Sequence, residues 1–264
     1  MSTRAHHPRR DAEAPHPSLT THPKTAAERS AHATSFGSVS ADYDAARPEY
    51  PTDAVAWLLS SQPARVIDVG AGTGKLTRAV AATGAEVIAV DPDARMLEQL
   101  SARSPQIRTL VGSGESLPVP DDSAEAIVYG QAWHWVDPIV AAAEAARVLV
   151  PGGVLGLIWN IRDVTDPFTR RLSLIMGDSA AERLDADGGP TIPEPFGPAD
   201  VETFHWVRTM NADTLVQLVA SRSLYIAAGP QERRDVDAAV RDLAGDGDVE
   251  LRYATRVYKA VPLT

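Results

Sequence analysis

The stretch that most constrains this chain runs from Val66 to Thr77 and reads VIDVGAGTGKLT. Its first residues are mostly apolar and β-branched, which is typical of a buried strand, and a glycine-rich turn follows directly. Glycine adopts backbone angles that strain other residues, and it lets a ligand approach the main chain closely. Residues 75–82 have helical composition, and a helix N-terminus offers free N–H groups to electron-rich ligand atoms. The stretch therefore predicts a strand, a tight turn and a helix that hold a small, nucleotide-like ligand.

Three cofactor-binding motifs compete for this turn. The dinucleotide fingerprint G-x-G-x-x-G needs a third glycine where this chain has Lys75. The phosphate-binding loop G-x-x-x-x-G-K-[ST] needs one more residue between its glycines, and a hydroxyl where this chain has Leu76. The spacing present, D-x-G-x-G-x-G, resembles the first motif of class I S-adenosylmethionine-dependent methyltransferases. An ordinary glycine turn of an α/β protein is the remaining alternative.

A second apolar strand is predicted at 86–90, and it ends in Asp91. This carboxylate follows the glycines by about 20 residues, where an acidic side chain accepts hydrogen bonds from the ribose hydroxyls of a cofactor. The position serves NAD and S-adenosylmethionine alike. Asp91 also precedes Pro92, so it could instead cap a helix that begins with this proline.

Composition narrows the class of protein. The chain has 264 residues, no cysteine and a formal net charge of −10. Disulfides, cysteine nucleophiles and thiolate metal sites are therefore excluded. The acidic balance argues against nonspecific binding of nucleic acid or anionic membranes, and no apolar run is long enough to span a bilayer. We expect a cytoplasmic protein that acts on a small molecule without a metal, and the sequence leaves its oligomeric state open.

The chain divides by composition. Residues 1–35 are rich in His, Pro, Ser and Thr, so we expect a disordered tail. The rest, 36–264, is predicted to form one methyltransferase domain. Its expected parts are an N-terminal lid and helix (36–60), a cofactor-binding core (61–163), and a substrate-side half with the last strands (164–264).

Strands and helices alternate through the core. Strands are predicted over 65–69, 86–90, 107–111, 125–130 and 153–159, and helices over 74–82, 93–101 and 137–148. Alternation of this kind predicts an α/β fold with parallel strands, helices on both faces, and ligands at the carboxyl ends of the strands. The resemblance implies a Rossmann-like class I methyltransferase fold, with a seven-stranded, mostly parallel sheet whose final strand is antiparallel. A Pro/Gly loop is expected over 183–200.

Two further segments resemble the type 11 family of small-molecule methyltransferases. Residues 112–118, GSGESLP, are similar to the family pattern G-D-A-E-x-L-P, with Ser113 in place of the aspartate. Residues 131–135, QAWHW, match the pattern Q-A-x-H-W that follows the fourth strand. The resemblance implies adenine contacts at 113–115, passage of 131–132 beside the cofactor, and an approach of Tyr43 or Arg47 to its methionine carboxylate. The expected cofactor-binding residues are Tyr43, Arg47, Asp68, Gly70, Ala71, Gly72, Gly74, Asp91, Pro92, Met96, Ser113, Gly114, Glu115, Gln131 and Ala132.

Candidates for substrate contact follow the strands or lie near the chain's end. They are Trp135, Asn160, Arg162 and Tyr225. Arg162 suits a carboxylate substrate, although a surface pair with Asp163 or Asp166 is equally consistent with the sequence. Tyr225 is equally plausible as a core residue.

His134 is the one candidate for a catalytic base. Histidine can take a proton from a hydroxyl or amine acceptor, and loss of such a base lowers turnover about 10²-fold or more. A structural histidine packed between Trp133 and Trp135 is the alternative, and a carboxylate acceptor would need no base. We therefore expect an S-adenosylmethionine-dependent methyltransferase acting on an O, N or carboxylate acceptor. An NAD-dependent Rossmann oxidoreductase and a non-catalytic S-adenosylmethionine-binding protein are the alternatives.

Overall fold

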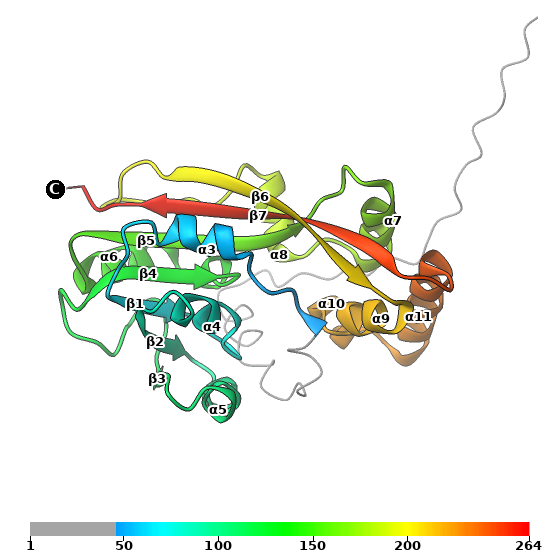
Figure 1. Ribbon diagram of the computed structural model, residues 1–264, viewed down its shortest axis with the longest axis horizontal. Helices are drawn as coiled ribbons and strands as arrows, with labels where there is room; N and C mark the ends of the chain where they lie inside the picture. Colours follow the sequence, from blue (N-terminus) through cyan, green and yellow to red (C-terminus); the bar gives the residue numbers. More distant parts are fainter. Residues whose placement is uncertain (1–45, 264) are drawn as a thin grey trace, which may run out of the picture.

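Seven strands form one sheet in the order β3-β2-β1-β4-β5-β7-β6 (Figure 1). The structure is a computed structural model that describes residues 46–263, so the predictions for the tail and for Tyr43 lie outside the described residues. The strands are β1 (Arg65–Val69), β2 (Glu86–Asp91), β3 (Arg108–Val111), β4 (Ala124–Gly130), β5 (Leu149–Arg162), β6 (Asp200–Met210) and β7 (Val249–Ala260). Strands β1 to β5 pair in parallel, and β7 is antiparallel to both of its neighbours. The predicted fold class is confirmed, including the antiparallel last strand.

Helices cover both faces of the sheet. They are α3 (Thr52–Leu58), α4 (Lys75–Ala81), α5 (Ala94–Arg103), the short 3-10 helix η2 (Trp133–Trp135), α6 (Pro138–Val148), α7 (Pro167–Met176), α8 (Ala180–Ala186), α9 (Ala212–Ala220), α10 (Ser223–Ala227) and α11 (Pro230–Ala244). Apolar residues of α3, α4 and α5 share one core cluster with one face of the sheet, and those of α6 and α8 share a second cluster with the other face. Alternate residues of the buried strands supply both clusters, since side chains along a strand point to opposite faces.

A third core cluster lies at the distal part of β6 and β7. Helices α7, α9 and α11 pack there around Met210, Leu251 and Tyr253. In Figure 1 this helical group lies beyond the end of the sheet toward which the arrow of β4 points. The carboxyl ends of the parallel strands therefore point toward the side of the molecule on which α9 and α10 lie.

Two predicted boundaries are wrong. The first residues of the expected loop at 183–200 belong to α8, because Ser179 and Glu182 form a reciprocal capping box that starts a helix at Ala180. Strand β5 is longer than predicted and continues to Arg162, because β7 pairs with it as far as Tyr253. The extra length of β5 depends on its pairing with β7, which is far away in the sequence. The start of α8 depends on the capping box, which lies just before the expected loop.

Candidate functional site

The glycine turn after β1 is closed on one side and open on the other. The backbone N–H groups of Gly70 and Ala71 donate to the carbonyl of Val90, at 2.8 and 3.1 Å. Gly70 has a φ of +70°, and a Cβ added there would lie 2.5 Å from Cβ of Ala132. At Gly72 the φ is +54°, and an added Cβ would meet no atom within 4 Å. The turn therefore packs tightly at Gly70 and leaves room for a ligand against the backbone at Gly72.

Asp91 joins the second strand to this turn. Its Oδ2 accepts a hydrogen bond from Gly72 N at 2.8 Å, and its Oδ1 accepts one from Asp93 N at 2.8 Å. Burial raises the pKa of Asp91. Helix α5 begins at Ala94 with Asp93 as its cap, so the alternative in which Asp91 caps a proline-initiated helix is wrong. The Asp91 carboxylate instead lies beside the open part of the turn, where ribose hydroxyls bind in folds of this type.

Asp68 on β1 has a buried oxygen without a partner. Its side chain is fully buried, and Thr77 Oγ1 donates to Oδ2 at 2.6 Å, while Oδ1 makes no hydrogen bond. Burial raises the pKa of Asp68 to about 7, and the nearby Asp91 adds to that rise. Buried polar atoms are rarely left unsatisfied, so this oxygen fits a ligand that brings a donor or a positive charge.

The segment after β3 forms a small turn at the same edge of the sheet. Ser113 and Ser116 exchange backbone hydrogen bonds at 3.3 and 3.1 Å, so Gly114 and Glu115 form the tip. A Cβ at Gly114 would lie 3.0 Å from the Tyr129 hydroxyl, which is buried and has no hydrogen-bond partner. The Glu115 carboxylate accepts from Asp137 N at 2.9 Å, so it connects the tip to the cap of α6.

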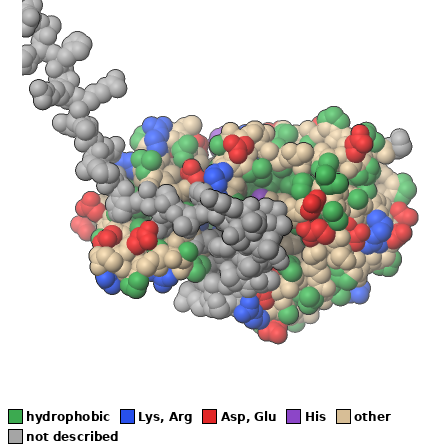
Figure 2. All heavy atoms as spheres, turned by 180° about the vertical axis from the view of Figure 1, so that it is seen from behind, with side chains coloured by type: hydrophobic (Ala, Val, Ile, Leu, Met, Phe, Trp, Pro, Cys, Tyr) green, Lys and Arg blue, Asp and Glu red, His purple; other side chains and the backbone are tan. Residues whose placement is uncertain are grey.

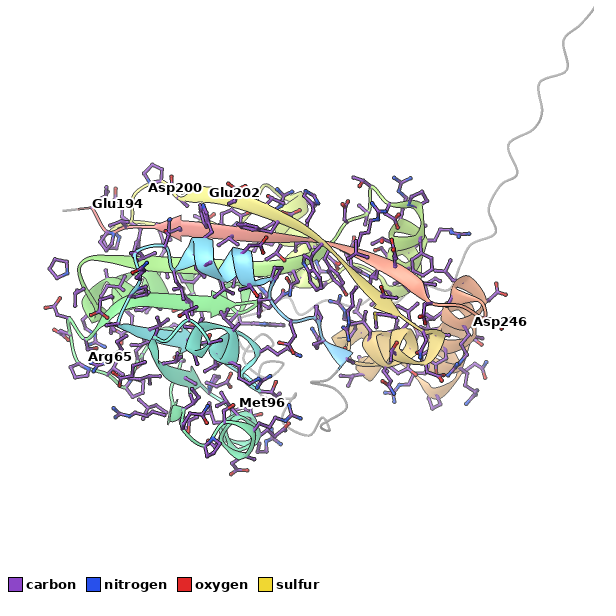
Figure 3. The ribbon with its side chains drawn as sticks, viewed as in Figure 1. Arg65, Met96, Glu194, Asp200, Glu202 and Asp246 are labelled. Atoms are coloured by element: carbon purple, nitrogen blue, oxygen red, sulfur yellow. The ribbon has the colours of Figure 1, made fainter. Side chains whose placement is uncertain are left out.

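The segment after β4 lies against the glycine turn. Gln131 has a left-handed φ of +59°, and its side-chain amide donates to the carbonyl of Asn160 at 3.1 Å. Such a φ is uncommon outside glycine, and it brings Ala132 against Gly70. Met96, which Figure 3 labels beside α5, is buried, whereas Pro92, which precedes this helix, is exposed.

The chain before α3 crosses this edge. The Lys75 ammonium forms an ion pair with Glu49 at 2.5 Å, and the Asn160 side-chain amide donates to the Glu49 carbonyl at 3.1 Å. Arg47 donates to the carbonyl of Ser221 at 2.7 Å. The Tyr50 hydroxyl, which sequence reasoning treated only as an apolar anchor, lies close enough to Asp68 for that carboxylate to raise its pKa, after burial as the larger cause. Nothing in the sequence around Tyr50 indicates this proximity, because Asp68 is on β1, in a different segment of the chain.

Three of the predicted substrate residues form hydrogen bonds to other side chains of the protein. Arg162 is 2% exposed and its guanidinium binds both oxygens of Glu182, at 2.5 and 2.6 Å, so the surface pair with Asp163 or Asp166 is wrong. The Asn160 side chain accepts from Thr255 at 2.7 Å. The Tyr225 hydroxyl contacts both oxygens of Asp237 at 3.0 Å within the helical group. The structure therefore brings neither Arg162 nor Tyr225 to the glycine turn with free polar atoms.

His134 lies in η2 between aromatic rings. Its Nδ1 accepts from the Trp159 indole N–H over a long 3.5 Å, and its ring centroid lies 4.7 Å from that of Trp135. Burial lowers the pKa of His134 to about 4, with the charge of Arg183 as a second cause. The imidazole is therefore neutral at pH 7, and the hydrogen bond to Nδ1 favours a proton on Nε2.

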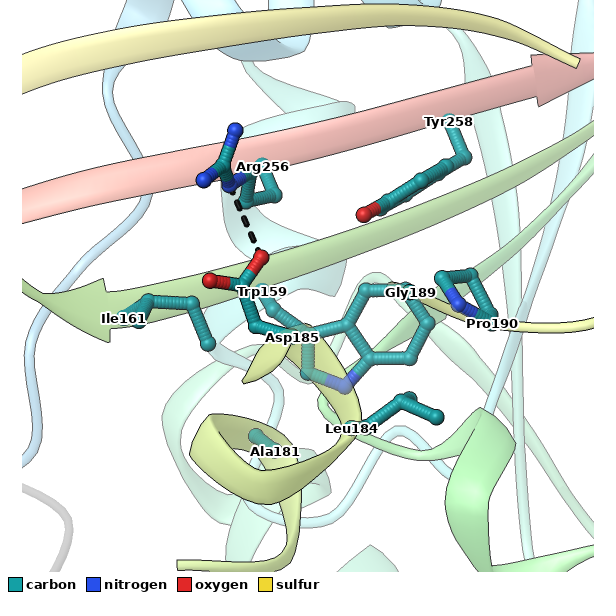
Figure 4. Close-up of a pocket in the computed structure, with 9 residues that line it drawn as sticks. All are labelled: Trp159, Ile161, Ala181, Leu184, Asp185, Gly189, Pro190, Arg256 and Tyr258. Atoms are coloured by element: carbon teal, nitrogen blue, oxygen red, sulfur yellow. Dashed lines mark ion pairs between the residues drawn. The ribbon is translucent and has the colours of Figure 1, made fainter. Parts of the chain in front are cut away.

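A small cavity lies on the other side of Trp159 (Figure 4). It measures about 10 Å³, which is room for one water molecule, so it is too small for a substrate. Tyr258 packs edge to face on Trp159, with ring centroids 5.8 Å apart. The ion pair between Arg256 and Asp185, 2.8 Å long, lies at its rim in Figure 4. The packing of Tyr258 orients Trp159, whose indole N–H contacts His134.

On the face shown in Figure 2, acidic and basic side chains of the described residues lie scattered among one another. Within residues 46–263 no helix combines the length and the apolar character that crossing a membrane would require. In the same part of the chain, no group of three or more His, Asp or Glu side chains is placed to hold a metal ion.

Comparison with known proteins adds independent information. Residues 67–157 match a family model described as a methyltransferase domain. An uncharacterised methyltransferase of Mycobacterium tuberculosis is 44% identical over 86% of this chain and 95% of its own length. An uncharacterised methyltransferase-like protein of Schizosaccharomyces pombe is 33% identical over 77% of this chain and 83% of its own. Among solved structures, a putative type II methyltransferase from Anaeromyxobacter dehalogenans superposes with a TM-score of 0.64 at 25% identity, covering 82% of this chain and 97% of that one.

Proposed function

The chain belongs to this methyltransferase family, and from that premise we propose that it binds S-adenosylmethionine at the glycine turn and methylates a small molecule. The observation that carries the proposal is the pairing of Asp91 with the open Gly72, at 2.8 Å between Oδ2 and N. A carboxylate at the end of the second strand, next to an uncovered glycine backbone, fits the ribose of a nucleotide-like cofactor. The unpartnered oxygen of Asp68 fits the same ligand, because the methionine end of S-adenosylmethionine carries an amino group.

Each part of the site has a proposed task. Asp91 would accept hydrogen bonds from the ribose hydroxyls, and the backbone of Gly114 and Glu115 would hold the adenine. Arg47, and Tyr43 before it, would bind the methionine carboxylate through charge-assisted hydrogen bonds. When bound, S-adenosylmethionine supplies an electrophilic methyl group on a sulfonium centre. The protein then has to align the acceptor and exclude water, which is where most of the rate enhancement of such a displacement arises.

Calorimetric titration tests the proposal. We expect S-adenosylmethionine and S-adenosylhomocysteine to bind, and Asp91→Ala to weaken both about ten- to hundredfold, since hydrogen bonds to a charged group contribute about 1.5–3 kcal/mol. Glu86→Ala is the matched control, because Glu86 begins the same strand at its opposite end and is exposed. Its affinity should equal that of the wild type. Binding of NAD alone, or equal affinities in wild type and Asp91→Ala, would contradict the assignment of the site.

The role of His134 has its own test. We expect His134→Ala to lower kcat less than tenfold, because an imidazole with a pKa of about 4 is a weak base and its Nδ1 already accepts from Trp159. The rate should also be independent of this group between pH 6 and 8, since it is neutral throughout that range. A loss of about 10²-fold would establish His134 as the base and favour a hydroxyl or amine acceptor. A small loss favours an acceptor that is already nucleophilic at neutral pH, such as a carboxylate.

A further inference from the structure

A group of polar side chains lies buried where the end of β5 meets α8 and the junction of α9 and α10. Three elements and one junction supply its four residues: Arg162 of β5, Glu182 of α8, Tyr253 of β7, and Arg222 between α9 and α10. Tyr253 is 1% exposed and Arg162 is 2% exposed, whereas Glu182 and Arg222 are partly buried, so the cluster extends from the interior toward the surface. It lies at the carboxyl-end side of the sheet, because Arg162 ends β5 and Arg222 directly precedes α10.

Within this cluster the Glu182 carboxylate pairs with Arg162. Glu182 accepts from Arg162 Nε and Nη2 with its two oxygens, and from Ser179 N with one of them. Burial alone would raise the pKa of Glu182, but the adjacent Arg162 outweighs burial and holds it far below its ordinary value. Glu182 is therefore an ionised partner of Arg162, and its hydrogen bonds go to Arg162 and Ser179 rather than to Arg222.

Arg222 is left without a carboxylate of its own. Its Nε is buried and has no hydrogen-bond partner, and within the described part of the chain no ion pair reaches its guanidinium. Burial lowers the pKa of Arg222 to about 10, with the charges of Arg162 and Arg47 acting in the same direction and Glu182 opposing them. A buried N–H without an acceptor is costly, and a ligand that brings an acceptor would satisfy it.

Tyr253 adds a second unused donor. Its hydroxyl is buried without a hydrogen-bond partner, and the arginines at 222, 162 and 208 are near enough to lower its pKa against the larger effect of burial. Its ring is stacked on Trp206, with centroids 4.8 Å apart and planes 17° from parallel, so the hydroxyl is held in one place. A fixed hydroxyl and a guanidinium N–H that both lack acceptors are the donors that an oxyanion requires.

The cluster is also connected to the cofactor site. Arg47 donates to the carbonyl of Ser221, the residue before Arg222, at 2.7 Å. Three residues later the same segment places Tyr50 near Asp68. A molecule that reaches from Arg222 toward the glycine turn would therefore lie along residues 47–50.

Building on the proposed function, we propose that Arg222 and Tyr253 bind an oxyanionic group, a carboxylate or a phosphate, on the methyl acceptor. The acceptor is accordingly an acid, and its anion supplies the acceptor that the buried Nε–H of Arg222 lacks. Arg162, which the sequence suggested for this task, instead holds Glu182 and fixes the wall of the site. A planar guanidinium suits both oxyanions, and the two are told apart by experiment.

Thermal unfolding of the full chain with saturating S-adenosylhomocysteine tests this. Sodium acetate and sodium phosphate are each compared with sodium chloride at equal ionic strength. For the wild type we expect one of the two anions to raise Tm by about 3–6 °C, as binding at about ten times Kd does for a domain of this size. Arg222→Met should lose this response, and should be no less stable than the wild type without anion, because it removes a buried N–H that lacks an acceptor.

Two further variants keep the result interpretable. Tyr253→Phe retains the stacked ring and should show a reduced anion response. Arg234→Met is the matched control, because Arg234 is exposed on α11 and bonds only to Gln231 of the same helix; it should respond like the wild type. A larger response to acetate identifies a carboxylate and a larger response to phosphate a phosphate. Equal responses in wild type, Arg222→Met and Tyr253→Phe, or no response beyond chloride in the wild type, would overturn the proposal. The Tm shift caused by S-adenosylhomocysteine itself reports separately on the proposed function.

Discussion

Replacing Gly70 by alanine should lower the free energy of unfolding by about 3 kcal/mol, with about 1–2 from a left-handed φ and about 1–3 from overpacking. Both causes are visible at this residue, because its φ is +70° and the added Cβ would lie 2.5 Å from Cβ of Ala132. Ala132 cannot retreat easily, since it follows the strained Gln131 and is 7% exposed. The turn would have to open, so affinity for S-adenosylhomocysteine should fall as well.

Gly84→Ala is the control for that experiment. Gly84 has a φ of +95°, and an added Cβ would meet no atom within 4 Å, so only the backbone strain is introduced. Urea unfolding should show a loss of about 1–2 kcal/mol, with cofactor affinity unchanged. Equal losses in Gly70→Ala and Gly84→Ala would mean that the close contact between Gly70 and Ala132 does not exist.

The second large effect is expected at the buried ion pair. Glu182→Gln should cost about 3–5 kcal/mol, because it leaves the Arg162 guanidinium buried without a counter-charge. The double variant with Arg162→Met should recover a substantial part, since the uncompensated charge is then gone, while glutamine still serves the capping box. The exposed pair of Arg65 and Glu86 provides the contrast, because its side chains are 43% and 58% exposed. Glu86→Gln should change stability by less than about 1 kcal/mol.

Acid denaturation tests the direction in which the stability of the protein changes with pH. The pKa of Glu182 lies far below its ordinary value, so the ion pair contributes stability above about pH 4.5, and this contribution is lost as the pH falls. Wild-type stability should therefore fall more steeply below pH 4.5 than that of Glu182→Gln. Parallel pH profiles, or a loss under 1 kcal/mol at pH 7, would show that the pair is solvated.

The local parts of the site could be predicted from sequence. The spacing of the glycines after a β-branched strand, and the acid at the end of the next strand, are determined by neighbours along the chain. The parallel direction of the strands follows from the alternation of elements, and the seven-stranded sheet from family resemblance. These are the features in which local propensity and fold agree.

The remainder depends on contacts between distant segments. Arg162 has two carboxylates within four residues, Asp163 and Asp166, and nothing in the sequence indicates that it turns inward to Glu182. The sequence indicates only that Tyr50 is an apolar anchor, whereas its proximity to Asp68 depends on the fold. The proximity of Arg222 to Tyr253 depends on the register of β7 and on the junction of α9 and α10, which no periodicity specifies.

The most direct test of the central claim is a crystal structure of the full chain with S-adenosylhomocysteine. The ribose hydroxyls should lie within hydrogen-bonding distance, about 2.6–3.2 Å, of the Asp91 carboxylate, with the adenine beside Gly114 and the methionine end toward Asp68. The ligand should cover Gly72 without displacing Gly70. S-adenosylhomocysteine bound elsewhere, or a ribose without contact to Asp91, would contradict the assignment of this edge of the sheet as the cofactor site.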